Sequence, residues 1–267
     1  MISAAFALLA TSCMEHHVTI RLNKDGSGTI TEETTLGAQV LAMMEQMAGL
    51  GGEGAEAPDP TADMMDKDKA EAAAKKMGEG VTLEKIEKID EAKRKGARTV
   101  YAFKDINKVK YGFGDSLDDM GEDMGPGGAG EEEEAADEDK PMEFAYADGV
   151  LTLKNKAMDG KKPEGGDGEA PETDPAELAQ AKQMLDGMKM SIRLEFPGGI
   201  EETNATHREG DTVTMMEMDM SQLLEDPEAF AKLQKEQPES PADMAEALKG
   251  IKGMKVETNE ELKVKLK

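Results

Sequence analysis

The sequence predicts an α+β fold in which antiparallel β-hairpins form a sheet, helices pack on one face of it, and disordered acidic linkers interrupt the chain. Three observations carry this prediction. Short runs alternate apolar with polar residues and are joined by Asp-Gly or other glycine turns, as in β-hairpins. Other segments have apolar residues three and four apart, which is the spacing of an amphipathic helix. The remaining stretches are rich in Gly, Pro and acidic residues and lack the apolar side chains of a core.

The composition indicates a modest core and a strongly acidic protein. Of 267 residues, 38% are hydrophobic and 3% aromatic, while Met occurs 21 times, so flexible thioethers must fill space that Phe and Leu usually fill. The chain has 57 acidic and 32 basic residues, hence a net charge of −25. Because this charge repels phosphate backbones, we expect no nucleic-acid partner.

The N-terminus has the order of an export signal. Residues 2–10 form an apolar run that is too short to span a bilayer but has the length of the hydrophobic part of a signal peptide. The run ends at Thr11, Ser12 and Cys13, and Cys13 is the single Cys of the chain, so it forms neither an internal disulfide nor by itself a zinc site. This order resembles the lipobox of bacterial lipoproteins.

The lipobox resemblance implies that residues 1–12 are removed as a signal peptide and that the Cys13 thiol carries diacylglycerol, with palmitate among its acyl groups. We therefore expect an exported protein, anchored to a bacterial membrane on its periplasmic or cell-surface face through Cys13. The alternative is a buried N-terminal strand with an ordinary thiol. No second hydrophobic run reaches the about 18 residues that a membrane-spanning helix needs.

Residues 13–114 are predicted to form the N-terminal part of the domain. Residues 18–22 alternate and lead through Asp25 and Gly26 into a second strand at 29–31, which predicts a hairpin. Two helices are expected next, one over residues 39–50 and one from near Thr61 to Gly78. A second strand pair follows at residues 81–90 and 98–103, with a bulge or bend in its first strand.

Residues 115–140 form an acidic insertion that we expect to be disordered. They contain twelve acidic side chains and one basic one, so they carry −11 of the total charge. Weak collection of divalent cations by residues 115–139 is the alternative function that we consider for the protein. A solvated spacer is the commoner role of such a run.

Residues 141–236 are predicted to complete the same domain. The expected elements are a hairpin over residues 144–153 that turns at Asp148-Gly149, a helix over 174–185, strands at 190–196, 200–205 and 212–220, and a helix over 223–233 capped by Ser221. The C-terminal segment, residues 237–267, is interrupted by Pro and offers one possible strand at Val256 or Val264.

Two segments share one pattern. Residues 18–22 and 190–194 have the same alternation with Ile at the centre and Arg after it, which suggests two related strands or halves. No exact repeat accompanies this likeness.

Residues 23–31 resemble the first nine positions of an EF-hand calcium loop. The twelfth position is Thr34 in place of the usual Glu, and the residues before the loop alternate as in a strand. We therefore interpret this segment as a hairpin turn.

Met216, Met218 and Met220 alternate along a predicted strand, and thioethers at such spacing can bind Cu(I). Met43 and Met47 lie at helical spacing, where Met replaces Leu in packing. We therefore interpret the Met residues as core residues and predict neither a metal site nor a cofactor.

The histidines and serines do not form a recognisable catalytic pattern. His16 and His17 are neighbours on a predicted strand and so point to opposite faces, and His207 lies in a polar loop. The sequence contains no Gly-x-Ser-x-Gly and no phosphate-binding glycine loop of the required form. We predict no catalytic residue and no enzyme activity; a hydrolytic site without a motif ranks last among the hypotheses.

Several segments together resemble the LppM-type bacterial lipoproteins: Cys13, residues 18–31, residues 103–107 and residues 194–204. The resemblance implies a surface-exposed, β-rich domain with a role in envelope lipid binding and no known catalytic centre. We therefore expect a membrane-anchored, non-catalytic envelope protein that binds a lipid or an envelope protein through an apolar groove or interaction surface.

Overall fold

The computed structural model describes residues 13–50, 59, 61–112, 142–154, 187–226, 247–248 and 250–267, without the side chains of residues 45 and 47–50. The acidic insertion at 115–140, the predicted helix at 174–185 and residues 1–12 lie outside the described residues.

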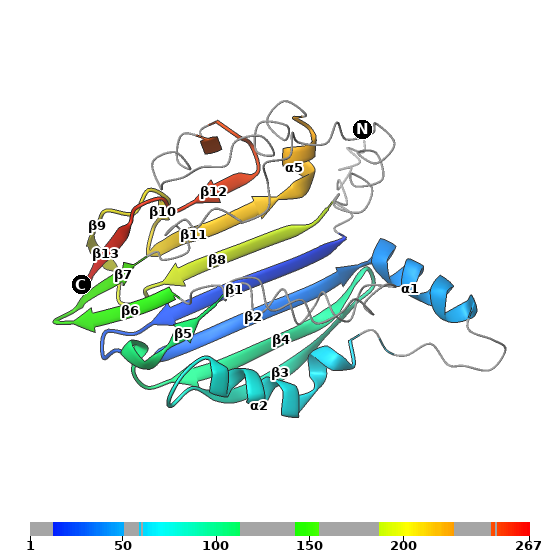
Figure 1. The fold of residues 1–267 in the computed structure, drawn as a ribbon, viewed down its shortest axis with the longest axis horizontal. Helices are drawn as coiled ribbons and strands as arrows, with labels where there is room; N and C mark the ends of the chain where they lie inside the picture. Colours follow the sequence, from blue (N-terminus) through cyan, green and yellow to red (C-terminus); the bar gives the residue numbers. More distant parts are fainter. Residues whose placement is uncertain are drawn as a thin grey trace, which may run out of the picture.

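Most of the described residues belong to two β-sheets (Figure 1). The described part of the larger sheet has eight strands in the order β10-β11-β8-β1-β2-β4-β3, with β12 paired to β11. The strands of this main sheet are β1 (Met14–Leu22), β2 (Gly28–Gly37), β3 (Thr82–Glu91), β4 (Arg94–Phe103), β8 (Lys189–Glu195), β10 (Arg208–Glu209), β11 (Thr212–Asp219) and β12 (Met254–Val256).

A smaller sheet of five described strands has the order β5-β6-β7-β13-β9. Its strands are β5 (Lys110–Tyr111), β6 (Met142–Ala147), β7 (Val150–Lys154), β9 (Ile200–Thr203) and β13 (Glu261–Leu266). The sequence predicted one strand, at Val256 or Val264; strands exist at both positions, and each joins a different sheet.

The predicted hairpins are confirmed. The β1–β2, β3–β4 and β6–β7 pairs are antiparallel. The turn of the β6–β7 hairpin has positive φ at Asp148 and Gly149, as a tight two-residue turn of this type requires. The expected bulge in the third strand is present between Leu83 and Lys85, where the pairing of β3 with β4 shifts by one residue.

The described helices are few and short. They are α1 (Ala38–Leu50), α2 (Lys67–Lys76) and α5 (Met220–Leu224), with single 3-10 turns at η1 (Asp63–Met65) and η2 (Ile106–Lys108). Asp66 caps α2 by accepting hydrogen bonds from the backbone N–H groups of Asp68 and Lys69, and α2 buries Ala70 and Ala74.

The predicted cap of the last helix is wrong by two residues. The Asp219 carboxylate accepts from the backbone N–H of Gln222 and caps α5. The Ser221 hydroxyl instead accepts from the Gly187 backbone N–H at 2.8 Å. Ser221 therefore holds the start of β8 against α5. Capping preferences concern only residues close in the sequence, so they do not predict this contact.

The predicted arrangement of helices on one face of an antiparallel sheet is wrong in two respects. In the described part of the chain a second sheet, more than any helix, covers the main sheet, so the fold is mostly β. The main sheet is also mixed, because β1 and β8 are parallel, with Val18 opposite Ile192 and Ile20 opposite Leu194. The two segments that share a sequence pattern are therefore neighbours, offset by two residues from the alignment of their sequences.

The two sheets enclose a common core. Val18, Ile20 and Ile30 of the main sheet belong to one cluster of buried residues with Leu153 and Val264 of the smaller sheet. Each fully buried side chain of this kind contributes about 1.5–3 kcal/mol to folding. The hydrophobic effect at this interface therefore holds the two sheets together.

The smaller sheet packs at the end of the main sheet where the β1–β2 turn lies. The Tyr146 hydroxyl of β6 donates to the Lys24 carbonyl at 2.7 Å, and the Ile106 backbone N–H donates to the Gly26 carbonyl at 2.9 Å. The opposite end of the main sheet carries Cys13 and α1 (Figure 1).

Candidate functional site: a polar network on the main sheet

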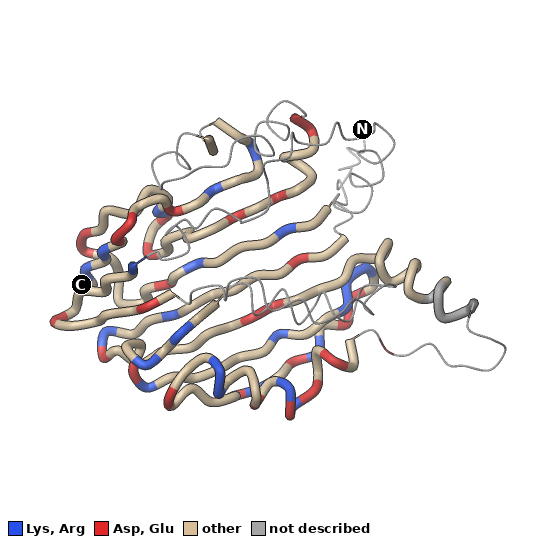
Figure 2. Tube along the Cα trace, viewed as in Figure 1, with Lys and Arg blue, Asp and Glu red and all other residues tan. Residues whose placement is uncertain are grey.

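A polar network occupies the face of the main sheet that points away from the common core. Residues of β1 alternate between the two faces, so Glu15 and His17 lie opposite to Val18 and Ile20. Figure 2 shows acidic and basic residues interspersed over the neighbouring strands. The polar network comprises Glu15, His17, Glu33, Arg94, Arg98, Lys189, Ser191, Arg193, Glu217, Asp219 and Lys255.

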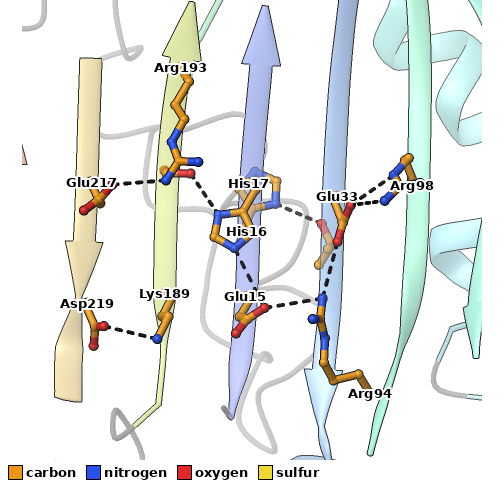
Figure 3. A network of polar contacts seen from close by, with 12 residues as sticks. Glu15, His16, His17, Glu33, Arg94, Arg98, Lys189, Arg193, Glu217 and Asp219 are labelled. Atoms are coloured by element: carbon orange, nitrogen blue, oxygen red, sulfur yellow. Dashed lines mark hydrogen bonds and ion pairs between the residues drawn. The ribbon is translucent and has the colours of Figure 1, made fainter. Parts of the chain in front are cut away.

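His17 lies at the centre of the polar network (Figure 3). Its Nδ1 is 2.8 Å from the Ser191 hydroxyl oxygen of β8, and its Nε2 is 3.8 Å from a Glu15 carboxylate oxygen. Burial lowers the pKa of His17 and outweighs the Glu15 carboxylate, which favours the protonated ring. The imidazole is therefore held mainly in its neutral form at pH 7.

Two arginines of β4 extend the network toward β2. Arg94 Nη2 lies 3.4 Å from the Glu15 carboxylate and 3.3 Å from that of Glu33, so it bridges β1 and β2. Arg98 donates to Glu33 Oε2 from Nη2 at 2.7 Å and from Nε at 3.0 Å. The hydrogen bond with Glu33 raises the pKa of Arg98. These contacts join β1, β2 and β4.

Three further ion pairs extend the network to the other edge. Lys189 Nζ is 3.2 Å from the Asp219 carboxylate, and Arg193 Nη2 is 3.1 Å from that of Glu217. Lys255 of β12 donates to Glu217 at 2.9 Å. The hydrogen bond from Lys255, assisted by Arg193, lowers the pKa of Glu217. The network thus connects six strands by side chains as well as by backbone hydrogen bonds.

The polar network has five cationic side chains for its four carboxylates. Each of its carboxylates contacts at least one cationic side chain. The side chains of Glu15 and Asp219 are only 16% and 14% exposed, so removing one cation would leave a partly desolvated carboxylate without its counter-charge. These ion pairs can fix the register of neighbouring strands.

Ser191, His17 and Glu15 follow the order of a hydroxyl, an imidazole and a carboxylate that hydrolases use to activate a nucleophile. Ser191 is 1% exposed and is paired with β1 on one side and β11 on the other. A substrate carbonyl cannot approach a hydroxyl in this position. The arrangement therefore does not offer a nucleophile in this conformation.

His16 points to the opposite face from His17, as predicted. It is 2% exposed, and its Nδ1 lies 2.9 Å from the Thr34 hydroxyl oxygen. Burial, with a smaller contribution from His17, lowers the pKa of His16 to about 4. His207 lies in the loop before β10, also as predicted.

Cys13 directly precedes β1 and is 5% exposed. Its backbone N–H donates to the Gly187 carbonyl at 3.2 Å, and its carbonyl accepts from the Gly37 N–H at 2.7 Å. The Cys13 Sγ is 3.9 Å from the Gln39 side-chain oxygen of α1. The predicted lipidation site thus lies directly before the first strand of the sheet, beside α1.

The calcium-loop resemblance corresponds to the β1–β2 turn. Asp25 Oδ1 accepts from the Ser27 backbone N–H at 3.0 Å and from its hydroxyl at 2.6 Å. Gly26 has a φ of 86°, as a turn glycine often does. The hairpin interpretation is confirmed. Within the described residues, no group of three or more His, Cys, Asp or Glu side chains could hold a metal ion.

Comparisons with known proteins place the chain only loosely. No family model and no curated protein matches it. Among solved structures it is similar to the folded domain of LppM from Mycobacterium tuberculosis, determined by NMR, with 10% identity, a TM-score of 0.31, and coverage of 80% of this chain and 85% of that chain. A TM-score this low makes that domain a weak structural neighbour. No helix among the described residues is long and apolar enough to cross a membrane.

The polar network escaped the sequence analysis. The sequence placed His16 and His17 on opposite faces of a strand, but the partner of His17, Ser191, is 174 positions away and carries no motif. The charges of the network alternate with apolar residues along each strand, as they do on any solvated face. The one available signal is the shared pattern of residues 18–22 and 190–194, which belongs to the two strands that bring His17 and Ser191 together.

Proposed function

We propose that this protein is an exported lipoprotein anchored through Cys13, and that its folded part is a non-catalytic module that binds a lipid or another envelope protein. One observation carries the proposal: an apolar run and small residues lead directly to the single Cys, and the folded sheet begins directly after that residue. Cleavage before Cys13 would leave every described strand complete, since the pairing of β1 with β2 starts at Met14.

The burial of the Cys13 side chain indicates at which stage of folding the lipid would be attached. The side chain is buried once β1 has paired with its neighbours, so an enzyme could not reach the thiol in the folded sheet. Lipid transfer would therefore precede the pairing of β1, as it does for a chain that is modified while it emerges from the export machinery. The alternative of an ordinary buried thiol requires no such order.

Among the described residues, the anchor end also carries the most exposed large hydrophobic side chain. Met43 of α1 is 53% exposed and is the one exposed large hydrophobic side chain among the described residues. The base of α1 touches Cys13 through Gln39. A lipid or partner protein that approaches the anchored end would meet α1 first, which supports α1 as part of the binding surface.

The non-catalytic part of the proposal is supported by the burial of Ser191. Ser191, His17 and Glu15 lie in the order hydroxyl, imidazole and carboxylate, but the Ser191 hydroxyl is inaccessible. The polar network instead serves the rigidity of the sheet that carries the binding surface.

The test is the fate of Cys13→Ser in a bacterial host that processes lipoproteins. We expect the natural chain in the membrane fraction, with a mass that corresponds to a start at Cys13 plus a lipid. Cys13→Ser should be released into the soluble periplasmic or medium fraction. Ser12→Ala, which keeps the thiol and a small residue before it, should stay membrane-bound.

Two outcomes would contradict the proposal. Membrane retention of Cys13→Ser would mean that the thiol is not the anchor. A natural chain that is soluble and carries no lipid mass would support the alternative, in which Cys13 is an ordinary buried residue directly before β1.

A further inference from the structure

Methionines gather at one corner of the core face of the main sheet. His16 of β1, Met190 of β8, Met218 of β11 and Met254 of β12 are successive Cα partners across four strands. Residues directly opposite each other in neighbouring strands project from the same face. These four side chains therefore form one row on that face.

A second row of thioethers lies beside the first. The backbone N–H of Met220 donates to the Met188 carbonyl at 2.9 Å, which places the start of α5 next to the residue before β8. Met188, Met218 and Met254 pack against a small cluster of buried residues that includes Met220 and is separate from the common core. Four methionines from four segments of the chain thus belong to one cluster, which we call the methionine corner: Met188, Met218, Met220 and Met254.

The methionine corner differs from the rest of the core in its composition. Four of the seven residues of this small cluster are Met, against four of the thirty-two residues of the common core. Leu223, Leu224 and Ile251 complete the cluster. If Met served only as a substitute for Leu throughout this Met-rich chain, it would be spread evenly between the two clusters, and it is not.

The methionine corner is accessible from solvent. Met220 is buried, whereas Met188, Met218 and Met254 are half-buried. Each Met side chain has three rotatable bonds, so its sulfur can turn toward a shared centre without a change in the backbone. The corner therefore combines sulfur donors, an apolar floor and a route for an ion.

We propose that the methionine corner binds a soft monovalent cation, Cu(I) or its analogue Ag(I). Thioethers are neutral, soft donors that select Cu(I) over hard cations such as Ca²⁺ and Mg²⁺, which require oxygen ligands. The thioethers themselves are uncharged and do not attract those ions. Met190 and His16 continue the first row away from the corner and extend the set of soft donors. The proposal does not depend on the lipid anchor.

The net charge of the chain favours such an ion. A charge of −25 raises the local concentration of any cation near the surface, and the thioethers themselves are uncharged. Because thioethers need no deprotonation before they bind a metal, the affinity should be nearly constant between pH 5 and 7, unlike that of a thiolate or imidazole site.

The test is a competition for Cu(I) between the protein and a chromophoric bicinchoninate chelator under reducing, oxygen-free conditions. The chain carries Cys13→Ser, so that the thiol does not compete. We expect the protein to withdraw one Cu(I) per chain, and the double variant Met218→Leu/Met254→Leu to lose at least tenfold in affinity. The control is Met77→Leu/Met215→Leu, which changes two buried methionines of the common core and should bind as the parent does.

Leu preserves the volume of Met, so circular dichroism and thermal unfolding should show both double variants folded. If the Met218→Leu/Met254→Leu variant does not fold, Met254→Leu alone replaces it, and the increase in melting temperature on addition of Ag(I) should be smaller than in the parent. X-ray absorption at the copper edge should show a sulfur-dominated shell.

Either of two results would overturn the proposal. One is a parent chain that takes no Cu(I) from the chelator. The other is a folded corner variant that binds Cu(I) as tightly as the parent, which would assign the binding to other residues.

Discussion

Neighbouring residues in one strand can meet opposite environments, and His16 and His17 demonstrate this. His16 faces the core side of the main sheet beside Thr34, while His17 faces the polar network beside Ser191. Burial lowers the pKa of both rings, and more strongly for His16, because the charged imidazolium loses its hydration there. Alternation alone assigns the faces but not this difference in burial.

His16 should make folding stability depend on pH. Its pKa is about 4 in the folded chain against 6.5 as the ordinary value, so the unfolded chain binds the proton more readily. Stability from this group is therefore unchanged above pH 6.5 and falls as the pH drops from 6.5 toward 4. At pH 5 the loss is about 2 kcal/mol. Urea unfolding at pH 7 and pH 5 measures it.

A variant of His16 provides the control for this pH dependence. His16→Gln removes the titrating ring and should reduce the difference between pH 7 and pH 5 by about 2 kcal/mol. An equal pH difference in His16→Gln and in the parent would refute the assignment to His16.

At the scale of elements, the close pairing of β2 with β4 depends on a glycine. Gly96 of β4 lies opposite Thr35, and a Cβ there would collide with the Thr34 carbonyl oxygen and come within 2.8 Å of the Thr35 Cα. Both are backbone atoms of a central strand, so they cannot move aside as a flexible side chain would. The glycine is required by this approach and not by an unusual φ.

Gly96→Ala should therefore destabilise the protein by about 2 kcal/mol or more, as other overpacking substitutions do. The free energy of unfolding in urea measures the effect. Gly198→Ala is the matched control, because a Cβ at Gly198 meets no atom within 4 Å, and it should change stability by less than about 0.5 kcal/mol. Equal stability of the two variants would mean that β2 and β4 are not packed this closely.

At the scale of the whole molecule, the C-terminal segment closes the structure. β12 extends the main sheet from β11, and β13 lies between β7 and β9 in the smaller sheet. Leu262, Val264 and Leu266 of β13 are buried in the common core. Glu257, between the two strands, is buried and accepts a hydrogen bond from the Thr206 backbone N–H at 2.7 Å. The last residues of the chain therefore bind both sheets together.

Removal of residues 254–267 should abolish cooperative unfolding, because β7 and β9 lose the strand between them and the core loses three buried side chains. The thermal transition followed by far-ultraviolet circular dichroism measures this. A full-length chain with Lys263→Ser and Lys265→Ser, two exposed positions of β13, should keep a single sharp transition. A sharp transition in the shortened chain would show that the smaller sheet does not need β13.

The sequence by itself determined where most of the longer strands lie, where the β1–β2 and β6–β7 turns lie, and that His16 and His17 face opposite ways. These features follow from alternation and from Asp-Gly turns, which act over a few neighbouring residues. The export signal and lipid anchor at Cys13 remain a prediction from the same local kind of pattern.

The tertiary structure alone decided which strands are neighbours: β1 beside β8 in parallel, β13 between β7 and β9, and a second sheet where helices were expected. It also assembled the polar network and the methionine corner, whose members come from distant segments. The physical reason is that the alternation of residues predicts only which face of a strand is apolar. Which surface covers that face depends on how the whole chain buries its apolar area.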